Sequence, residues 1–242
     1  MQKIALSLLA VALSATVAGA AQITNTIDSL TTFQSLSAEN ESVTNTVATG
    51  GAIGGFRTIS LTSTGNDPGF ATVLSVSGTS QRFSLSTPEG PTPTFTLLWG
   101  GADGTSGLGG VAFGGGETLD LFASVLSFSL RSADVPSNFT WTFTDTSNQA
   151  ATYSGVFPIQ SSTNPPLAID ITLDSFANAA GIDWNSIDYI SFSGGGVTGM
   201  DVSVPAPYRV VAATVPEPGT WALLATGAAV VTLALRRRQA RG

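Results

Sequence analysis

The stretch that decides the fold is Ser-Asn-Phe-Thr-Trp-Thr-Phe-Thr-Asp, residues 137–145. Three aromatic residues, Phe139, Trp141 and Phe143, alternate with threonines. Successive side chains of a strand point to opposite faces, so one face of this stretch is apolar and the other carries hydroxyl groups. The alternation predicts an antiparallel strand with one face in a core and the other in water.

Similar runs recur along the chain between Gly, Pro, Asn and Asp residues, which favour turns. About twelve predicted strands separated by turn signals are typical of a sandwich or barrel. We therefore predict an all-β fold, an antiparallel jelly-roll-like β-sandwich of residues 21–210. Residues 21–50 are expected to hold one or two strands with long loops, and residues 175–180 one or two helical turns. The predicted strands are 56–61, 71–77, 81–86, 94–99, 119–121, 125–130, 139–144, 151–157, 168–173, 187–192, 199–204 and 209–213.

Composition excludes several kinds of chemistry. The 242 residues include no cysteine and no histidine, and only 10% are charged. The chain therefore has no Ser-His-Asp triad, thiol nucleophile, disulfide, or imidazole or thiolate metal ligand. Residues 21–214 carry fifteen Asp or Glu but only four Arg. Such an acidic domain is a poor candidate for binding nucleic acid, which requires basic surface.

Carboxylates are the acid–base groups that remain. A glycosidase needs two of them about 5–9 Å apart, but nothing in the sequence marks a pair as catalytic, and most stand beside turn residues. We expect no catalytic residue and a non-catalytic domain, with a carboxylate-dependent glycosidase as the less favoured alternative. The pairs nearest in sequence are Glu117 with Asp120, Asp170 with Asp174, and Asp183 with Asp188.

No cofactor is expected, although a structural calcium ion, which prefers oxygen ligands, remains open. Its candidate ligands are Asp103, Glu117, Asp120 and Asp201.

Aromatic residues that stack on sugar rings must be exposed. Trp141 belongs to an apolar strand face and is expected in the core. Trp184 lies in a loop-like Asp-Trp-Asn context and is the possible ligand contact.

The N-terminus has the pattern of a secretory signal peptide. Lys3 is followed by a largely apolar stretch, residues 4–17, and by the small residues Ala18, Gly19 and Ala20. This order predicts export and cleavage after Ala20.

The C-terminus has three parts in a fixed order. Val215, Pro216, Glu217 and Pro218 come first, at the end of a Pro-rich linker over residues 211–220. Residues 221–235 are largely apolar and predict a short transmembrane helix. The basic cluster Arg236, Arg237, Arg238 and Arg241 then ends the chain. By the positive-inside rule, the arginines should hold this end in the cytoplasm.

This tripartite tail resembles the PEP-CTERM sorting signal of Gram-negative bacteria, over residues 215–242. The resemblance implies recognition by an exosortase, a membrane transpeptidase that removes the tail after export. It also implies transient membrane anchoring, delivery to the outer surface or extracellular matrix, and an association with exopolysaccharide and biofilm. A plain single-pass anchor with a Pro-rich stalk is the alternative.

Residues 110–204 are also similar to the jelly-roll-like domains that exported PEP-CTERM proteins often carry. For this domain, exposed aromatic residues in a concave groove would indicate a carbohydrate-binding module. A smooth polar face would indicate a structural role, and two converging carboxylates, one with a raised pKa, would indicate an enzyme.

Overall fold

The computed structural model describes residues 22–101 and 107–214. The predicted signal peptide, with its cleavage site at Ala18 and Ala20, lies outside the described residues. So do the Val215–Pro218 motif, the predicted transmembrane helix and the arginine cluster. Within the two described ranges, no helix is both long enough and apolar enough to cross a membrane.

The prediction of an all-β fold is confirmed. Strands and three short 3-10 turns make up the regular structure of the described residues. The strands are β1 (Gln22–Asp28), β2 (Gln34–Ala38), β3 (Ser42–Ala48), β4 (Phe56–Thr64), β5 (Thr72–Ser77), β6 (Arg82–Ser86), β7 (Thr92–Trp99), β8 (Val125–Leu130), β9 (Ser132–Ala133), β10 (Ser137–Asp145), β11 (Ala150–Phe157), β12 (Leu167–Thr172), β13 (Ile187–Gly195), β14 (Val202–Pro205) and β15 (Tyr208–Ala213). The 3-10 turns are η1 (Ile53–Gly55), η2 (Leu173–Ser175) and η3 (Ala179–Gly181).

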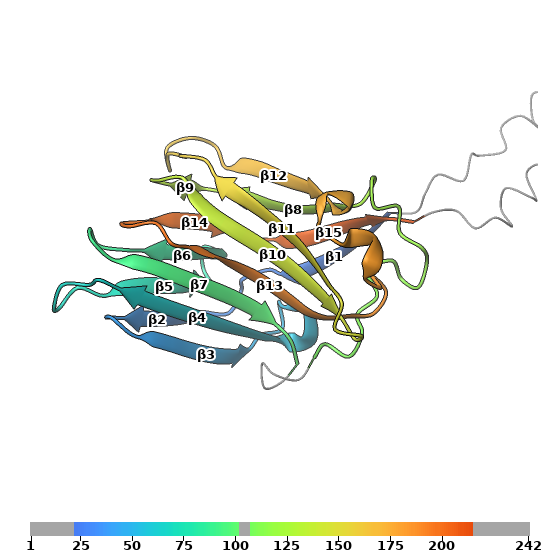
Figure 1. Cartoon of the computed structure of the whole chain (residues 1–242), viewed down its shortest axis with the longest axis horizontal. Helices are drawn as coiled ribbons and strands as arrows, with labels where there is room; N and C mark the ends of the chain where they lie inside the picture. Colours follow the sequence, from blue (N-terminus) through green and yellow to red (C-terminus); the bar gives the residue numbers. More distant parts are fainter. Residues whose placement is uncertain (1–21, 102–106, 215–242) are drawn as a thin grey trace, which may run out of the picture. The chain divides into compact units, whose positions relative to one another are not determined.

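The strands form three sheets, and every pairing between strands is antiparallel. The six-stranded sheet has the order β11-β10-β13-β7-β4-β3. A four-stranded sheet, β1-β15-β8-β12, and a five-stranded sheet, β2-β5-β6-β14-β9, complete the set. Figure 1 shows the six-stranded sheet as one layer, with the strands of the other two sheets behind it. The sandwich is thus one continuous sheet packed against two smaller ones.

The core forms where the apolar faces meet, as the alternation in β10 predicts. Trp141 is fully buried and stacks on Trp99 of β7, with ring centroids 5.7 Å apart, and on Phe192 of β13 at 4.7 Å. Phe128 of β8, from the facing layer, packs against Trp141 at 5.8 Å. Aromatic pairs of this kind add about 0.5–1.5 kcal/mol each beyond the burial of their area, so this cluster stabilises the contact between the layers.

The structure corrects several local predictions. Residues 22–48 form three regular strands, because paired neighbours compensate for their weak apolar pattern. Residues 119–121 do not form a strand. They lead into a turn in which Asp120 Oδ1 accepts hydrogen bonds from two backbone N–H groups. The expected helix at 175–180 is replaced by η2 and η3, since Asn178 between them adopts a left-handed conformation with φ 63°. The predicted strand at 209–213 is confirmed as β15, which pairs with β1 and occupies the first residues assigned to the linker.

Candidate functional site

The outer face of the six-stranded sheet carries a row of hydroxyl groups that crosses all six strands. The register of the sheet brings one residue of each strand into line, and every one of the six is Ser or Thr. The row contains Thr44, Ser60, Thr96, Ser193, Thr140 and Ser154. Each is exposed or half-buried, because it points away from the core.

One further row lies on each side of it. Strand geometry sets the rows about 7 Å apart along the strands, and neighbours within a row about 4.8 Å apart. None of the three rows contains Asp, Glu, Lys or Arg. We call the three rows together the hydroxyl face. The flanking rows are Thr46, Thr58, Leu98, Ser191, Thr142 and Thr152 on one side, and Ser42, Thr62, Thr94, Gly195, Asn138 and Val156 on the other.

At each edge of this face, hydroxyl groups of the two outermost strands form hydrogen bonds with each other. Thr44 Oγ1 and Ser60 Oγ lie 3.0 Å apart at the β3 edge, and Thr140 Oγ1 and Ser154 Oγ lie 3.0 Å apart at the β11 edge. Thr96 and Ser193, in the middle of the row, make no side-chain hydrogen bond within the described part of the chain. The centre of the face therefore presents hydroxyl groups to solvent.

A hollow of about 250 Å³ interrupts the hydroxyl face where β13 ends. Its walls include Thr94, Asn138 and Ser193, and its floor is the backbone of Gly194 and Gly195. Gly195 occupies a position in the flanking row, opposite Thr94 and Asn138. Its φ of +124° favours glycine, and an added Cβ would collide with the carbonyl oxygen of Pro93. Glycine is therefore required at this position beside the hollow.

Trp184, the sequence-predicted ligand contact, is only 5% exposed. Its Nε1 donates a hydrogen bond to the Ala179 carbonyl oxygen at 2.9 Å, and its ring packs on Phe143 at 5.2 Å. Trp184 and Asn185 line a second hollow of about 350 Å³. The loop context of Trp184 was predicted correctly, but its ring packs in the core and only a small part of it is exposed.

The exposed aromatic side chains of the described residues lie elsewhere. Phe33, Phe70 and Phe122 are 59–78% exposed and stand between strands. No Trp or Tyr is among the large exposed hydrophobic residues of this part of the chain. The hydroxyl face is accordingly polar apart from Leu98 and the exposed Val156, and none of the three exposed Phe residues belongs to it.

Three of the predicted carboxylates accept hydrogen bonds from backbone N–H groups, one within its own turn and two from distant segments. Asp183 Oδ1 accepts the Asn185 N–H at 2.9 Å, and Asp188 Oδ1 accepts the Gly109 N–H at 3.0 Å. Asp201 Oδ1 accepts the Thr87 N–H at 2.7 Å. Asp103, a candidate calcium ligand, lies outside the described residues. Over 22–101 and 107–214, no three acidic side chains gather in a group that could hold a metal ion.

Asp145, at the end of β10, has a pKa below its ordinary value. The main cause is the hydrogen bond from the Asp183 backbone N–H to Oδ2 at 2.9 Å; burial opposes it, and the N–H groups of Gln149 and Ser147 add to it. This direction is opposite to the one that a general acid requires.

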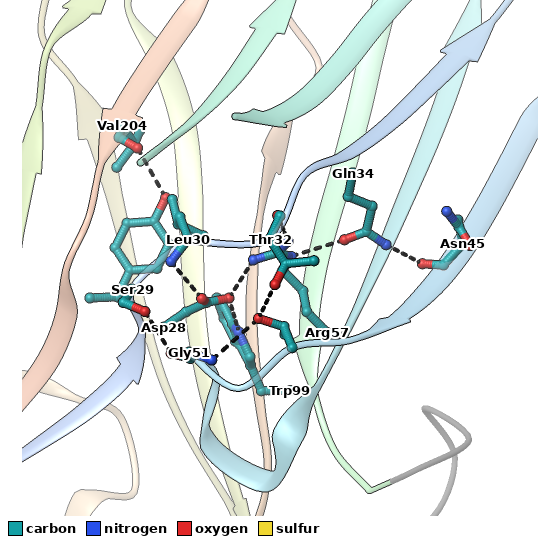
Figure 2. A network of polar contacts seen from close by, with 12 residues as sticks. Asp28, Ser29, Leu30, Thr32, Gln34, Asn45, Gly51, Arg57, Trp99 and Val204 are labelled. Atoms are coloured by element: carbon teal, nitrogen blue, oxygen red, sulfur yellow. Dashed lines mark hydrogen bonds and ion pairs between the residues drawn. The ribbon is translucent and has the colours of Figure 1, made fainter. Parts of the chain in front are cut away.

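A buried polar network joins the start of the chain to the six-stranded sheet (Figure 2). Arg57 of β4 donates from Nη1 to Asp28 Oδ2 at 2.8 Å, from Nε to Gln34 Oε1 at 2.9 Å, and from Nη2 to the Thr32 carbonyl at 2.7 Å. Trp99 Nε1 donates to the same Asp28 oxygen at 2.8 Å. This network was not predicted from the sequence. Its one signal in the sequence is that Arg57 lies within the predicted strand 56–61.

The described residues define an all-β sandwich whose largest sheet has an uncharged outer face. The sequence after its last strand identifies the sorting class: residues 214–238 match the PEP-CTERM protein-sorting motif, so this chain carries that motif. The resemblance seen in the tail is thereby confirmed.

No curated protein matches this chain. Among solved structures, it is similar to the family 11 carbohydrate-binding module of cellulase Lic26A-Cel5E of Clostridium thermocellum, with 14% identity over 82% of this chain and 99% of that one and a TM-score of 0.36. A family 30 carbohydrate-binding module of Clostridium thermocellum cellulase Cel9D-Cel44B has 14% identity over 60% of this chain and 76% of its own, with a TM-score of 0.34. The enzymatically active domain of tailspike protein 4 of bacteriophage CBA120 has 12% identity over 76% of this chain and 21% of its own, with a TM-score of 0.35.

Proposed function

We propose that this chain is a non-catalytic protein of the outer cell surface or extracellular matrix. It is exported, anchored transiently by its C-terminal segment, and processed by an exosortase at or near Val215–Pro218. The observation that carries the proposal is the PEP-CTERM motif at residues 214–238. The motif begins immediately after β15, which ends at Ala213, so a cut there would release the sandwich with every described strand intact.

The non-catalytic part of the proposal is supported by the chemistry of the side chains. The full sequence contains neither His nor Cys, which removes the commonest general base and the thiol nucleophile. Asp145 and Asp183 accept hydrogen bonds from backbone N–H groups of their own turns, and Asp188 accepts one from the distant Gly109 N–H. These carboxylates thus stabilise turns and loop contacts.

The structural role is supported by the surface. A polar face without exposed aromatic residues supports a structural role, and the hydroxyl face is of this kind apart from Leu98 and Val156. The net negative charge of the domain favours solubility outside the cell. The hydroxyl face itself has no basic patch that would attach it to anionic polymers. An association with exopolysaccharide in a biofilm fits this surface and the sorting tail.

The proposal is tested by the destination of the protein in a host that encodes an exosortase. The full chain should reach the outer surface or matrix, whereas a chain that ends at Thr214 should not. A Pro216→Ala/Pro218→Ala variant should be retained in the inner membrane, and Pro158→Ala, which changes an exposed proline of the sandwich, should behave as wild type. Equal surface delivery of the chain without a tail would overturn the proposal.

A further inference from the structure

We propose that the hydroxyl face binds a neutral polysaccharide, with one sugar unit seated in the hollow above Gly194 and Gly195. This inference rests on the proposed function and names the kind of matrix polymer that the sandwich holds.

The charge distribution selects a neutral ligand. Residues 21–214 carry fifteen acidic residues against four arginines, yet the three rows of the hydroxyl face contain neither sign of charge. An anionic polymer would meet repulsion from the domain and no cation on this face to offset it. A cationic polymer would find no carboxylate on it. A neutral polymer can lie across the face without either penalty.

The chemical groups of the face match those of a sugar. Each Ser or Thr hydroxyl both donates and accepts hydrogen bonds, as sugar hydroxyls do, and the Asn138 amide adds a donor and an acceptor at the hollow. Thr96, Ser193 and Asn138 are not committed to other side chains in the described structure, so they are available to a ligand. The Thr140–Ser154 pair, by contrast, is already bonded to itself.

The hollow provides a seat of suitable size and character. Its volume of about 250 Å³ lies just under the range of about 300–1,000 Å³ typical of whole small-molecule pockets, which suits one unit of a chain that continues over an open surface. Phe95 and Phe139 line it from below, beside the glycine backbone. The polar side chains Thr94, Asn138 and Ser193 around the hollow can bond the hydroxyl rim of a sugar ring.

The test uses the full chain, purified in detergent because of its apolar C-terminal segment. Affinity electrophoresis with dextran, a β-1,3-glucan and a galactomannan supplies neutral probes, and alginate supplies an anionic one. At least one neutral polymer should retard the protein, and alginate should not. Asn138→Ala and Ser193→Ala should each weaken binding about 2- to 10-fold, the loss expected for one hydrogen bond.

The five-stranded sheet offers a matched control. Its outer face carries a row of serines in the same kind of register, Ser35, Ser75, Ser84, Ser203 and Ser132. Ser75→Ala and Ser84→Ala should leave binding unchanged, since neither residue lines the hollow above Gly194 and Gly195.

Three outcomes would overturn the inference. They are retardation by none of the neutral polymers, retardation by alginate alone, and equal weakening by the substitutions on the two sheets. Unfolding curves of each variant separate a lost contact from a lost fold. Because binding is measured with purified protein, its failure would leave the proposed sorting intact, and failure of sorting in the host would not alter the binding result.

Discussion

Arg57 Nη1 and Asp28 Oδ2 lie 2.8 Å apart, and both side chains are fully buried. The two residues belong to different sheets: Asp28 ends β1 in the four-stranded sheet, and Arg57 is in β4 of the six-stranded sheet. Three donor atoms of the guanidinium group have partners, and both carboxylate oxygens accept hydrogen bonds. The pair therefore ties the two layers together.

Arg57→Met should destabilise the sandwich by about 3–5 kcal/mol, because it leaves the Asp28 carboxylate buried without a counter-charge. Arg82→Met, which changes an exposed arginine of β6, should cost less than about 0.5 kcal/mol. Urea unfolding followed by tryptophan fluorescence gives both values. If the two variants were equally stable, the network would have no role in holding the layers together.

Tyr208 should make the fold sensitive to alkali. Its pKa is raised well above the ordinary value, first by complete burial and then by the nearby Asp28 carboxylate, with Arg57 opposing. The folded phenol stays neutral while the unfolded one ionises near pH 10, so stability is full below about pH 10 and falls as pH rises above it. Tyr208→Phe should flatten this fall in unfolding free energy between pH 9 and 11. An unchanged slope would contradict the assignment.

Asp145 should contribute to the pH dependence of folding stability under acidic conditions. Its folded pKa is lowered, so the unfolded chain binds a proton first as the pH drops. The stabilisation is present above about pH 4, the ordinary value of an Asp carboxyl, and is lost as the pH falls towards the folded value. Asp145→Asn keeps the shape but not the charge and should show a shallower loss of stability between about pH 5 and 3. Parallel curves for variant and wild type would exclude this role.

Gly195→Ala should destabilise the protein by about 1–3 kcal/mol, since φ is +124° and the new Cβ would meet the Pro93 backbone. Gly50→Ala is the matched control, because its Cβ would meet nothing within 4 Å and its φ is not in the left-handed region. Thermal unfolding of the two variants measures the difference. A neutral Gly195→Ala would mean that the turn at the end of β13 is easily remodelled.

The sequence predicted the strands whose faces alternate strongly. The Phe-Trp-Phe series placed β10 correctly because burial of large aromatics dominates the local energetics. The Thr- and Asn-rich strand β3 gave no such contrast; it forms because β4 supplies a partner for its hydrogen bonds. The hydroxyl row could not be predicted, because it depends on the register of six strands, and register is a tertiary property. The burial of Trp184 could not be predicted for the same reason, because a loop position does not reveal which side chains pack against it.

The central claim, export followed by processing at the PEP-CTERM motif, is tested most directly by the mass of the mature protein in its own host. Intact-mass spectrometry of the protein from the surface or matrix fraction should show a chain that lacks residues 1–20 and ends at or near Val215–Pro218. Recovery of the protein from the membrane fraction alone, with Trp221 to Gly242 still attached, would contradict the account.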